Sequence, residues 1–221
     1  MGAQYRASVG AYTCHLIEII RRVVVYVKNP QALCVRPIRL NLGCGVAARQ
    51  GFVNVDLLDL PGVDVIADLN EPLSLLADDS VAEVISSHTL EHVRDFMVLM
   101  HEIHRVVCAN GRVAITVPHF SNPHGYSDPT HVRFFGLYSM SYFSNSRDPF
   151  RREVPNFYTG IRFRIESVRL CFGRYGRIDR ALGPLLDRIV NSSNWIQELY
   201  ERRLCWLWPC TEIQWVLRCD K

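Results

Sequence analysis

The 221-residue sequence lacks any uninterrupted apolar run long enough to cross a lipid bilayer. A spanning helix needs about 20 mostly apolar residues, whereas the most apolar N-terminal stretch, residues 16–27, is interrupted by Glu18, Arg21 and Arg22. These charges exclude a transmembrane segment there. Apolar residues recur in this stretch every three or four positions, so we expect an amphipathic helix that packs on the domain or contacts a partner.

The sequence also lacks the C-x-x-C spacing of cysteines. None of the eight cysteines belongs to a C-x-x-C motif, and no secretory signal precedes them. A disulfide framework in a secreted protein is therefore disfavoured. We expect reduced thiols and a cytoplasmic location.

The sequence has no internal repeats, no low-complexity tract and no linker long enough to separate two domains. Its hydrophobic content of 48% excludes disorder as the main state. We therefore predict a single domain over residues 1–221. It divides into an N-terminal helical extension (1–36), a core (37–120) and a C-terminal part with a loop, helices and strands (121–221).

A strongly basic segment is missing from the centre of the chain. Residues 51–146 carry 4 basic and 12 acidic side chains, while both flanks are mildly basic. A nucleic-acid-binding domain would instead concentrate basic residues on one face. Nucleic acid is therefore excluded as the expected partner.

Five short apolar runs follow one another in the core, at residues 38–42, 52–56, 63–67, 81–86 and 112–117. Nearly continuous hydrophobicity is typical of parallel strands that are buried on both faces. Between the last two runs, residues 90–107 have helical periodicity, and Asn110 and Gly111 are typical of a left-handed helix end. This alternation predicts a doubly wound α/β fold that binds ligands at the carboxyl ends of its strands.

The C-terminal part has a less regular pattern. It predicts a short helix at 137–143, a strand at 163–172, a helical segment at 174–209 and a final strand at 213–217. The helical segment would then be an insertion before the last strand.

A glycine loop follows the first strand of the core, in the segment LNLGCG at 40–45. Glycines there permit a sharp turn and let the backbone approach a nucleotide. With Ala48 the loop also satisfies a dinucleotide fingerprint, which would suit an NAD-dependent dehydrogenase. In that fingerprint the ribose-binding acid follows about 20 residues on, whereas Asp56 comes only 11 residues after Gly45. The spacing disfavours the dehydrogenase.

Two carboxylates follow strands at the ligand-binding edge. Asp56 ends the second predicted strand and Asp68 follows the third. A carboxylate at the first position can accept hydrogen bonds from both hydroxyls of a ribose. At the second it can accept one from an adenine amino group.

Five segments together resemble a small class I S-adenosylmethionine-dependent methyltransferase: LNLGCG (40–45), GFVNVD (51–56), ADL (67–69), SHTLEHV (87–93) and HRVVCANGRVAITVP (104–118). The later segment DPTHVRFF (128–135) resembles a small bacterial type that acts in surface-glycan and secondary pathways. The resemblance implies S-adenosylmethionine as cofactor. It also implies a Rossmann-like, mostly parallel, seven-stranded sheet, here with an extra N-terminal helix.

The resemblance assigns cofactor-binding residues by position in the motifs. It implies contacts with the methionine part, the ribose and the adenine from the following residues: Asn41, Gly43, Cys44, Gly45, Asp56, Leu57, Asp68, Leu69, Ser87 and His88. Two positions depart from the family pattern, since Asn41 replaces an acid and Ala47 replaces a glycine. Asn41 lacks the charge that would favour the ammonium group of the cofactor.

Histidines are concentrated in the loop after the fifth predicted strand, where an acceptor would meet the methyl group. Three interpretations stay open. His119 or His131 could be a general base oriented by Asp128; a divalent metal could be bound by His119, His124, Asp128 and His131; or the loop could simply cover the substrate. We also expect His124, Tyr126 and Arg133 to contact the substrate.

The sequence thus predicts an S-adenosylmethionine-dependent enzyme that methylates oxygen on a sugar, a glycan or another small hydroxylated acceptor. The alternative is a cofactor-binding subunit without catalytic activity that serves a partner. The Trp-rich segment 204–209 could lie on a membrane surface, cap the open edge of the sheet or form a homodimer contact.

Overall fold

The computed structural model describes residues 25–144, 149–173 and 176–221. Most of the predicted N-terminal amphipathic helix lies outside these ranges. Its last three residues form a strand, β1 (Val25–Val27), which pairs antiparallel with β4 (Val65–Ala67). A helical continuation over these three residues is therefore wrong, because their backbone groups are used at the edge of the sheet.

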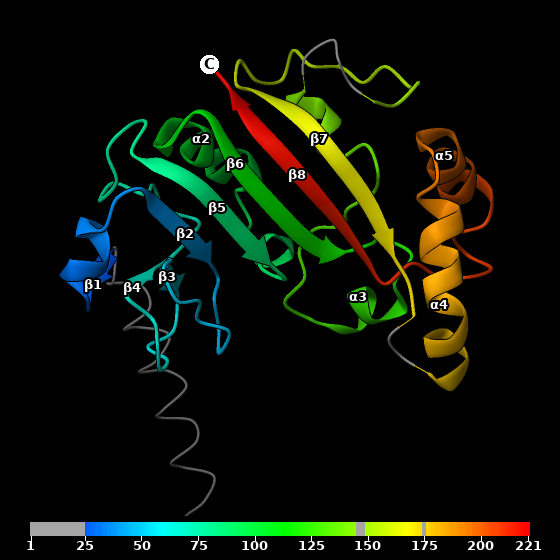
Figure 1. The fold of residues 1–221 in the computed structure, drawn as a ribbon, viewed down its shortest axis with the longest axis horizontal. Coiled ribbons are helices and arrows are strands. Elements are labelled where there is room, and N and C mark those ends of the chain that lie inside the picture. The colour runs from blue at the N-terminus through cyan, green and yellow to red at the C-terminus, as the bar shows by residue number, and fades with distance from the viewer. Residues whose placement is uncertain (1–24, 145–148, 174–175) are drawn as a thin grey trace, which may run out of the picture.

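One mixed sheet organises the described chain (Figure 1). Its eight strands run in the order β1-β4-β3-β2-β5-β6-β8-β7. Beyond β1 and β4 they are β2 (Ile38–Leu42), β3 (Val53–Asp56), β5 (Val81–Ser87), β6 (Val107–Pro118), β7 (Arg162–Cys171) and β8 (Glu212–Asp220). The strands β4, β3, β2, β5 and β6 are parallel, whereas β8 lies antiparallel between β6 and β7. The prediction of seven strands is corrected to eight by β1, and the Rossmann-like core is confirmed.

The helices are shorter than the periodicity predicts. The stretch 90–107 divides into a 3-10 helix, Leu90–His92, and α2 (Phe96–Val106). The helix predicted at 137–143 is only a 3-10 turn, Ser141–Phe143, and a further 3-10 helix spans Pro30–Cys34. The remaining helices are α3 (Pro123–Ser127), α4 (Arg177–Val190) and α5 (Asn194–Arg203).

Asn110 and Gly111 do not end α2. The helix stops at Val106 and the chain enters β6 at once, because Val107 pairs with Val81 of β5. Asn110 has a left-handed φ of 60°, but it adopts this conformation within β6.

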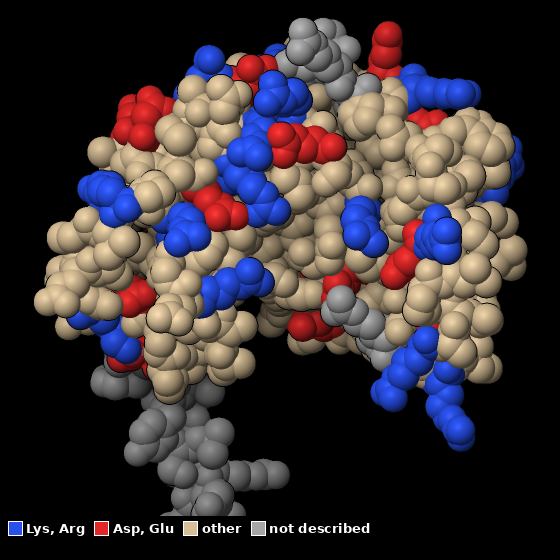
Figure 2. Space-filling model, viewed as in Figure 1, with Lys and Arg blue, Asp and Glu red and all other residues tan. Residues whose placement is uncertain are grey.

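One face of the sheet packs on α2, while the opposite face carries charge. Leu99, Met100 and Ile103 of α2 are almost fully buried in the core. On the other face, Arg112 pairs with Glu83 at 2.6 Å and Arg218 with Glu166 at 2.9 Å. Figure 2 shows Lys and Arg among Asp and Glu on one side of the molecule. Within the described ranges, the sheet is therefore not buried on both faces, contrary to the apolar pattern.

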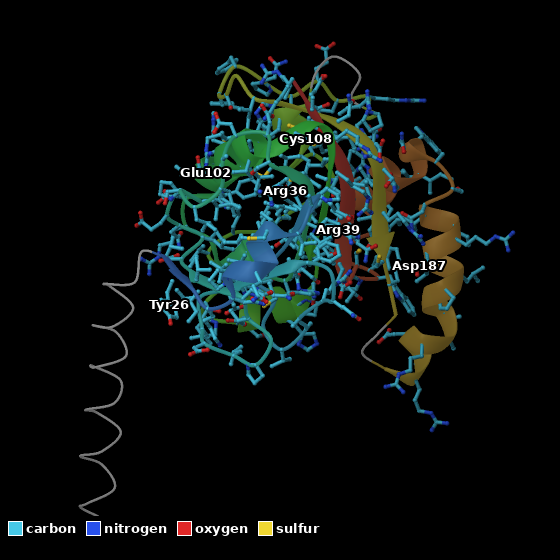
Figure 3. All side chains as sticks on the ribbon, turned by 60° about the vertical axis from the view of Figure 1, so that its left-hand side comes forward. Tyr26, Arg36, Arg39, Glu102, Cys108 and Asp187 are labelled. Carbon is cyan, nitrogen blue, oxygen red and sulfur yellow. The ribbon has the colours of Figure 1, made fainter. Side chains whose placement is uncertain are left out.

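The helices α4 and α5 flank the sheet beside β7 (Figure 1). Figure 3 shows α2, with Glu102, and α4, with Asp187, on opposite sides of the molecule. The carboxyl ends of β2, β5 and β6 point toward the end of the molecule where α3 lies (Figure 1). In the described part of the chain, no helix combines the length and apolarity that membrane crossing requires.

Candidate functional site

The loop after β2 is built on two left-handed glycines. Gly43 has φ 63° and Gly45 has φ 51°, a conformation that side chains other than glycine rarely adopt. A Cβ atom on Gly43 would lie 2.1 Å from Oγ1 of Thr89, whereas one on Gly45 would meet nothing within 4 Å. Gly43 thus permits close packing on Thr89, and Gly45 leaves its backbone open toward a ligand.

The Asn41 side chain supports this loop through hydrogen bonds. The side chain is only 5% exposed, and its amide donates to the Ala47 carbonyl at 3.1 Å and to Oδ1 of Asn54 at 2.9 Å. Asn54 Oδ1 also accepts from the Arg49 backbone at 2.7 Å. The residue that replaces the family's acid therefore joins the loop to β3.

Asp56 ends β3 directly beside the glycine loop. Its Oδ2 accepts from the Gly45 backbone at 2.7 Å, and its Oδ1 accepts from the Leu58 backbone at 3.0 Å. A carboxylate has about four acceptor positions, so each oxygen retains capacity for a further donor. Asp56 can fix the turn and still accept ribose hydroxyls. The neighbouring Leu57 is exposed.

The next edge position, Asp68, organises its own turn. Its Oδ1 accepts from the Asn70 backbone at 2.9 Å and from the Asn70 amide at 2.8 Å. Asn70 in turn accepts from the Arg94 backbone at 2.8 Å. Leu69 is buried beside this turn. Asp68 therefore lies in a connection between the end of β4 and the chain before α2.

Cys44 is not a nucleophile. Burial, and secondarily the nearby Asp56 carboxylate, raises the pKa of its thiol to about 11. The thiol is protonated at neutral pH. Its place in the glycine loop suits packing against a ligand, not reaction with it.

His88 follows β5 and places a positively charged side chain at the site. Its side chain is half-exposed, with Nε2 3.1 Å from Glu212 and Nδ1 3.6 Å from Glu91. The hydrogen bond to Glu212, and after it the nearby Glu91 carboxylate, raise the pKa of His88 to about 9. The ring is therefore an imidazolium at neutral pH. Ser87, immediately before it, is exposed.

The two carboxylates around His88 are absent from the predicted site. Glu91 is three residues from His88, which is helical spacing, so the sequence did carry a signal for it. Glu212 belongs to β8 and lies opposite Pro118 of β6. Its approach to His88 depends on antiparallel pairing over a long sequence separation, which no local pattern reveals.

His119 lies in the interior. Its side chain is fully buried, with Nδ1 2.8 Å from Ser121 and Nε2 3.1 Å from Glu201 of α5. Both ring nitrogens thus have partners within the fold. This arrangement ties the end of β6 to the C-terminal helices and leaves His119 without contact with solvent.

His131 and Asp128 come together at the edge of the site. Nδ1 of His131 donates to the Gly125 carbonyl at 2.9 Å, and Nε2 lies 3.7 Å from Asp128. Hydrogen bonds from Thr130 lower the pKa of Asp128, so this carboxylate is ionised. His124 is exposed on α3, where its backbone donates to Asn122 at 3.0 Å.

The predicted metal ligands His119, His124, Asp128 and His131 do not assemble. Among the described residues, the His, Cys, Asp and Glu side chains that could share an ion are Glu91, His92 and His131, with one ligand atom of each within 4.8 Å of the others. The expected set fails because His119 turns into the interior. Only His131 belongs to both groups.

An aromatic pocket of about 230 Å³ opens beside the same loop. Its walls are Phe96, Met97, Arg133, Phe134, Phe135, Ser139, Tyr142, Phe143 and Tyr158. Nε of Arg133 is buried there with no hydrogen-bond partner among the described residues, and Tyr126 stacks on Phe134 at 4.4 Å between ring centroids. The pocket thus combines flat apolar walls with an unused donor.

The Trp-rich segment after α5 is partly packed. The Trp206 ring lies 5.6 Å from that of Phe120, edge to face, although most of the indole is exposed. Cys205 is buried and Trp208 is partly buried against the core. The segment therefore covers the chain that leaves β6.

Comparison with protein families gives one match in the core of the chain. Residues 44–115 match the family model described as "Methyltransferase domain". A search of curated proteins finds no match.

Solved structures share the fold at low sequence identity. The chain is similar to a SAM-dependent methyltransferase from Archaeoglobus fulgidus, with 18% identity, a TM-score of 0.51 and coverage of 83% of this chain and 86% of that one. It is also similar to the MccD protein, with 12% identity, a TM-score of 0.51 and coverage of 86% and 93%. At these identities the likeness concerns the fold alone.

The geometry fits the cofactor that this domain implies. Gly45 leaves open space at the turn, and Asp56 retains acceptor capacity beside it. Buried Cys44 and Leu69 add apolar surface at the same edge. Residues 44–115 match a methyltransferase domain and lie on a Rossmann-like fold, and the cofactor is S-adenosylmethionine.

Proposed function

We propose that this protein transfers a methyl group to an oxygen of a small hydroxylated acceptor, such as a sugar or glycan. The aromatic pocket that is lined by Arg133 and Phe134 is the observation that carries this proposal. Flat aromatic walls with a few polar groups suit a small ligand that has apolar faces and hydroxyls. The unpartnered Nε of Arg133 would donate to an acceptor oxygen.

In this proposal the carboxyl edge of the sheet holds the cofactor. Gly43, Cys44 and Gly45 border its methionine part, and Asp56 accepts its ribose hydroxyls. The adenine lies against Asp68 and Leu69, while Ser87 and His88 face the methionine end. S-adenosylmethionine supplies an activated methyl group, so the main task of these residues is to align donor and acceptor. Alignment alone can contribute about 7–11 kcal/mol to lowering the barrier.

We assign proton uptake to His131. The Gly125 carbonyl can only accept, so Nδ1 of His131 carries the hydrogen and Nε2 of the neutral ring holds a lone pair. As the acceptor oxygen bonds to the methyl carbon and the carbon–sulfur bond breaks, the hydroxyl proton passes to Nε2. Asp128, 3.7 Å away, would stabilise the resulting imidazolium. His119 has no such opening, because its ring is buried.

The replacement His131→Gln tests this assignment. A general base typically contributes about 10²–10⁴-fold to the rate, so turnover should fall by at least tenfold. Affinity for S-adenosylhomocysteine, measured by titration calorimetry, should stay unchanged. The assay is a screen of sugar and other hydroxylated acceptors with methyl-labelled cofactor.

His101→Gln serves as the matched control, since His101 is an exposed histidine of α2 that bonds Thr159. It should retain activity. Turnover by His131→Gln within tenfold of the unmodified protein would reject His131 as the base. Binding of S-adenosylhomocysteine without methylation of any acceptor would favour the non-catalytic subunit instead.

The same proposal places the protein in the cytoplasm. Seven cysteines, Cys34 among them, are free thiols in the structure. Free thiols persist where the surroundings are reducing.

A further inference from the structure

Glu91 has a buried carboxylate with unused acceptor capacity. The residue is 1% exposed, and neither carboxylate oxygen has a hydrogen-bond partner among the described residues. Nδ1 of His88 lies 3.6 Å from Oε1, which balances charge but exceeds hydrogen-bond length. Burying a carboxylate without hydrogen bonds is costly, so these oxygens point to a missing partner.

His92 lies close to this carboxylate, with one ring nitrogen within 4.8 Å of a Glu91 oxygen. Oγ1 of Thr130 donates its single hydrogen to Oδ1 of Asp128, 2.5 Å away. Oγ1 must then accept from Nδ1 of His92, 2.9 Å away. Nδ1 therefore carries the hydrogen of a neutral His92 ring, and Nε2 is left as an acceptor.

His131 has the same tautomer for a separate reason. Its Nδ1 donates to the Gly125 carbonyl, so its Nε2 also holds a lone pair. The His92 and His131 rings meet edge to face with centroids 4.7 Å apart. Each histidine is thus oriented by a hydrogen bond on the far nitrogen, as metal-binding histidines usually are.

We propose that Glu91, His92 and His131 bind a first-row divalent metal ion. Two imidazoles and one carboxylate suit Mn²⁺, Fe²⁺, Co²⁺ or Zn²⁺ better than Mg²⁺ or Ca²⁺, which prefer oxygen ligands. One ligand atom of each residue already lies within 4.8 Å of the others. The remaining coordination positions would be open to water or to two neighbouring hydroxyls of an acceptor.

The role of the metal ion in methyl transfer rests on the proposed function, whereas the binding of the ion does not. A metal-bound hydroxyl is more acidic than a free one. With the ion present, His131 would serve as a ligand and the coordinated hydroxyl would release its proton to water, after which its oxygen bonds to the methyl carbon as the carbon–sulfur bond breaks. When the ion is absent, Nε2 of His131 takes up the proton directly. His88 competes with the ion for Glu91, and Asp128 lies 3.7 Å from Nε2 of His131 as a further oxygen donor.

The test uses the full chain, freed of metal with EDTA, dialysed and titrated with Co²⁺ in the absence of cofactor and acceptor. We expect one saturable site by calorimetry and a visible Co²⁺ spectrum without thiolate charge-transfer bands. Glu91→Gln and His131→Gln should each weaken Co²⁺ binding by more than tenfold. Thr130→Val, which removes the partner of His92 Nδ1, should weaken it by about tenfold.

His124→Gln is the control, because His124 belongs to the loop but not to the cluster. It should bind Co²⁺ like the unmodified protein, and circular dichroism should show all variants folded. Equal Co²⁺ affinity in Glu91→Gln and the unmodified protein, or no saturable site, would overturn the proposal. A methylation assay, run with and without EDTA, separates the failure of the metal site from the failure of the proposed methyl transfer. Saturable Co²⁺ binding without methylation of any acceptor would contradict only the proposed function.

Discussion

At the scale of single residues, Asp56 and the glycine loop are joined by a hydrogen bond that the Gly45 backbone donates to Oδ2 of Asp56. The glycine loop and Asp56 lie where the motif predicts them. Asn41, however, bonds Ala47 and Asn54 within the fold, and His119 is enclosed by Ser121 and Glu201. A motif gives the strand end at which a side chain starts, but the direction of the side chain depends on partners that come from distant segments.

Asp56 should contribute directly to cofactor affinity. Asp56→Asn keeps an oxygen that can accept from Gly45 or Leu58 but removes the charge and half of the acceptor capacity. Losing charge-assisted hydrogen bonds of about 1.5–3 kcal/mol should weaken S-adenosylhomocysteine binding by roughly tenfold to a hundredfold. Calorimetry measures this, with Asp59→Asn as control, since Asp59 pairs with Lys28 instead. Equal affinities for Asp56→Asn and the control would remove Asp56 from the cofactor site.

At the scale of elements, α2 is anchored by one arginine. Arg105 donates to Glu102 on α2, to the Leu73 and Leu76 carbonyls, and to Asp78. It therefore fixes the chain before β5 against the helix that supports the site. Periodicity predicts the helix but not the contacts with Leu73, Leu76 and Asp78, because these three partners lie in an irregular segment.

Arg105→Met should lower the free energy of unfolding by about 1–3 kcal/mol, the usual range for losing hydrogen bonds to a charged group. Urea unfolding at neutral pH measures the change. Arg94→Met, at an exposed position before the helix, should have little effect. If Arg105→Met lowers the free energy of unfolding no more than Arg94→Met does, the hydrogen bonds of Arg105 add nothing to stability.

The same network predicts a pH dependence. Hydrogen bonds from Arg105 hold the pKa of Glu102 below its usual value of 4.5. The ionised form is thus favoured in the folded state, so its contribution is complete above about pH 4.5 and is lost as pH falls through the lowered pKa. The free energy of unfolding should fall more steeply on acidification in the unmodified protein than in Glu102→Gln. Parallel slopes in urea titrations would contradict this.

At the scale of the whole molecule, local sequence patterns predict the parallel strands of the core but not how β1 and β8 pair with them. The runs at 38–42 and 81–86 correspond closely to β2 and β5, because most side chains of both strands are buried or partly buried. Pairing of β1 at the edge and of β8 between β6 and β7 depends on long-range contacts instead. The Glu212–His88 contact and the charged face of the sheet follow from that topology, so neither could be predicted locally.

The distribution of cysteines offers a test of the whole fold. Cys34 is exposed, whereas Cys44, Cys205, Cys210 and Cys219 are buried, and burial raises the pKa of each buried thiol. Alkylation requires an accessible thiolate. Under native conditions at about pH 8, iodoacetamide should therefore modify Cys34 much faster than these four, as measured by peptide mass spectrometry. In urea all five should react at similar rates, since both access and the ordinary thiol pKa are restored. Native labelling of Cys210 as fast as that of Cys34 would contradict the packing of β8 against β6 and β7, because Cys210 is fully enclosed directly before β8.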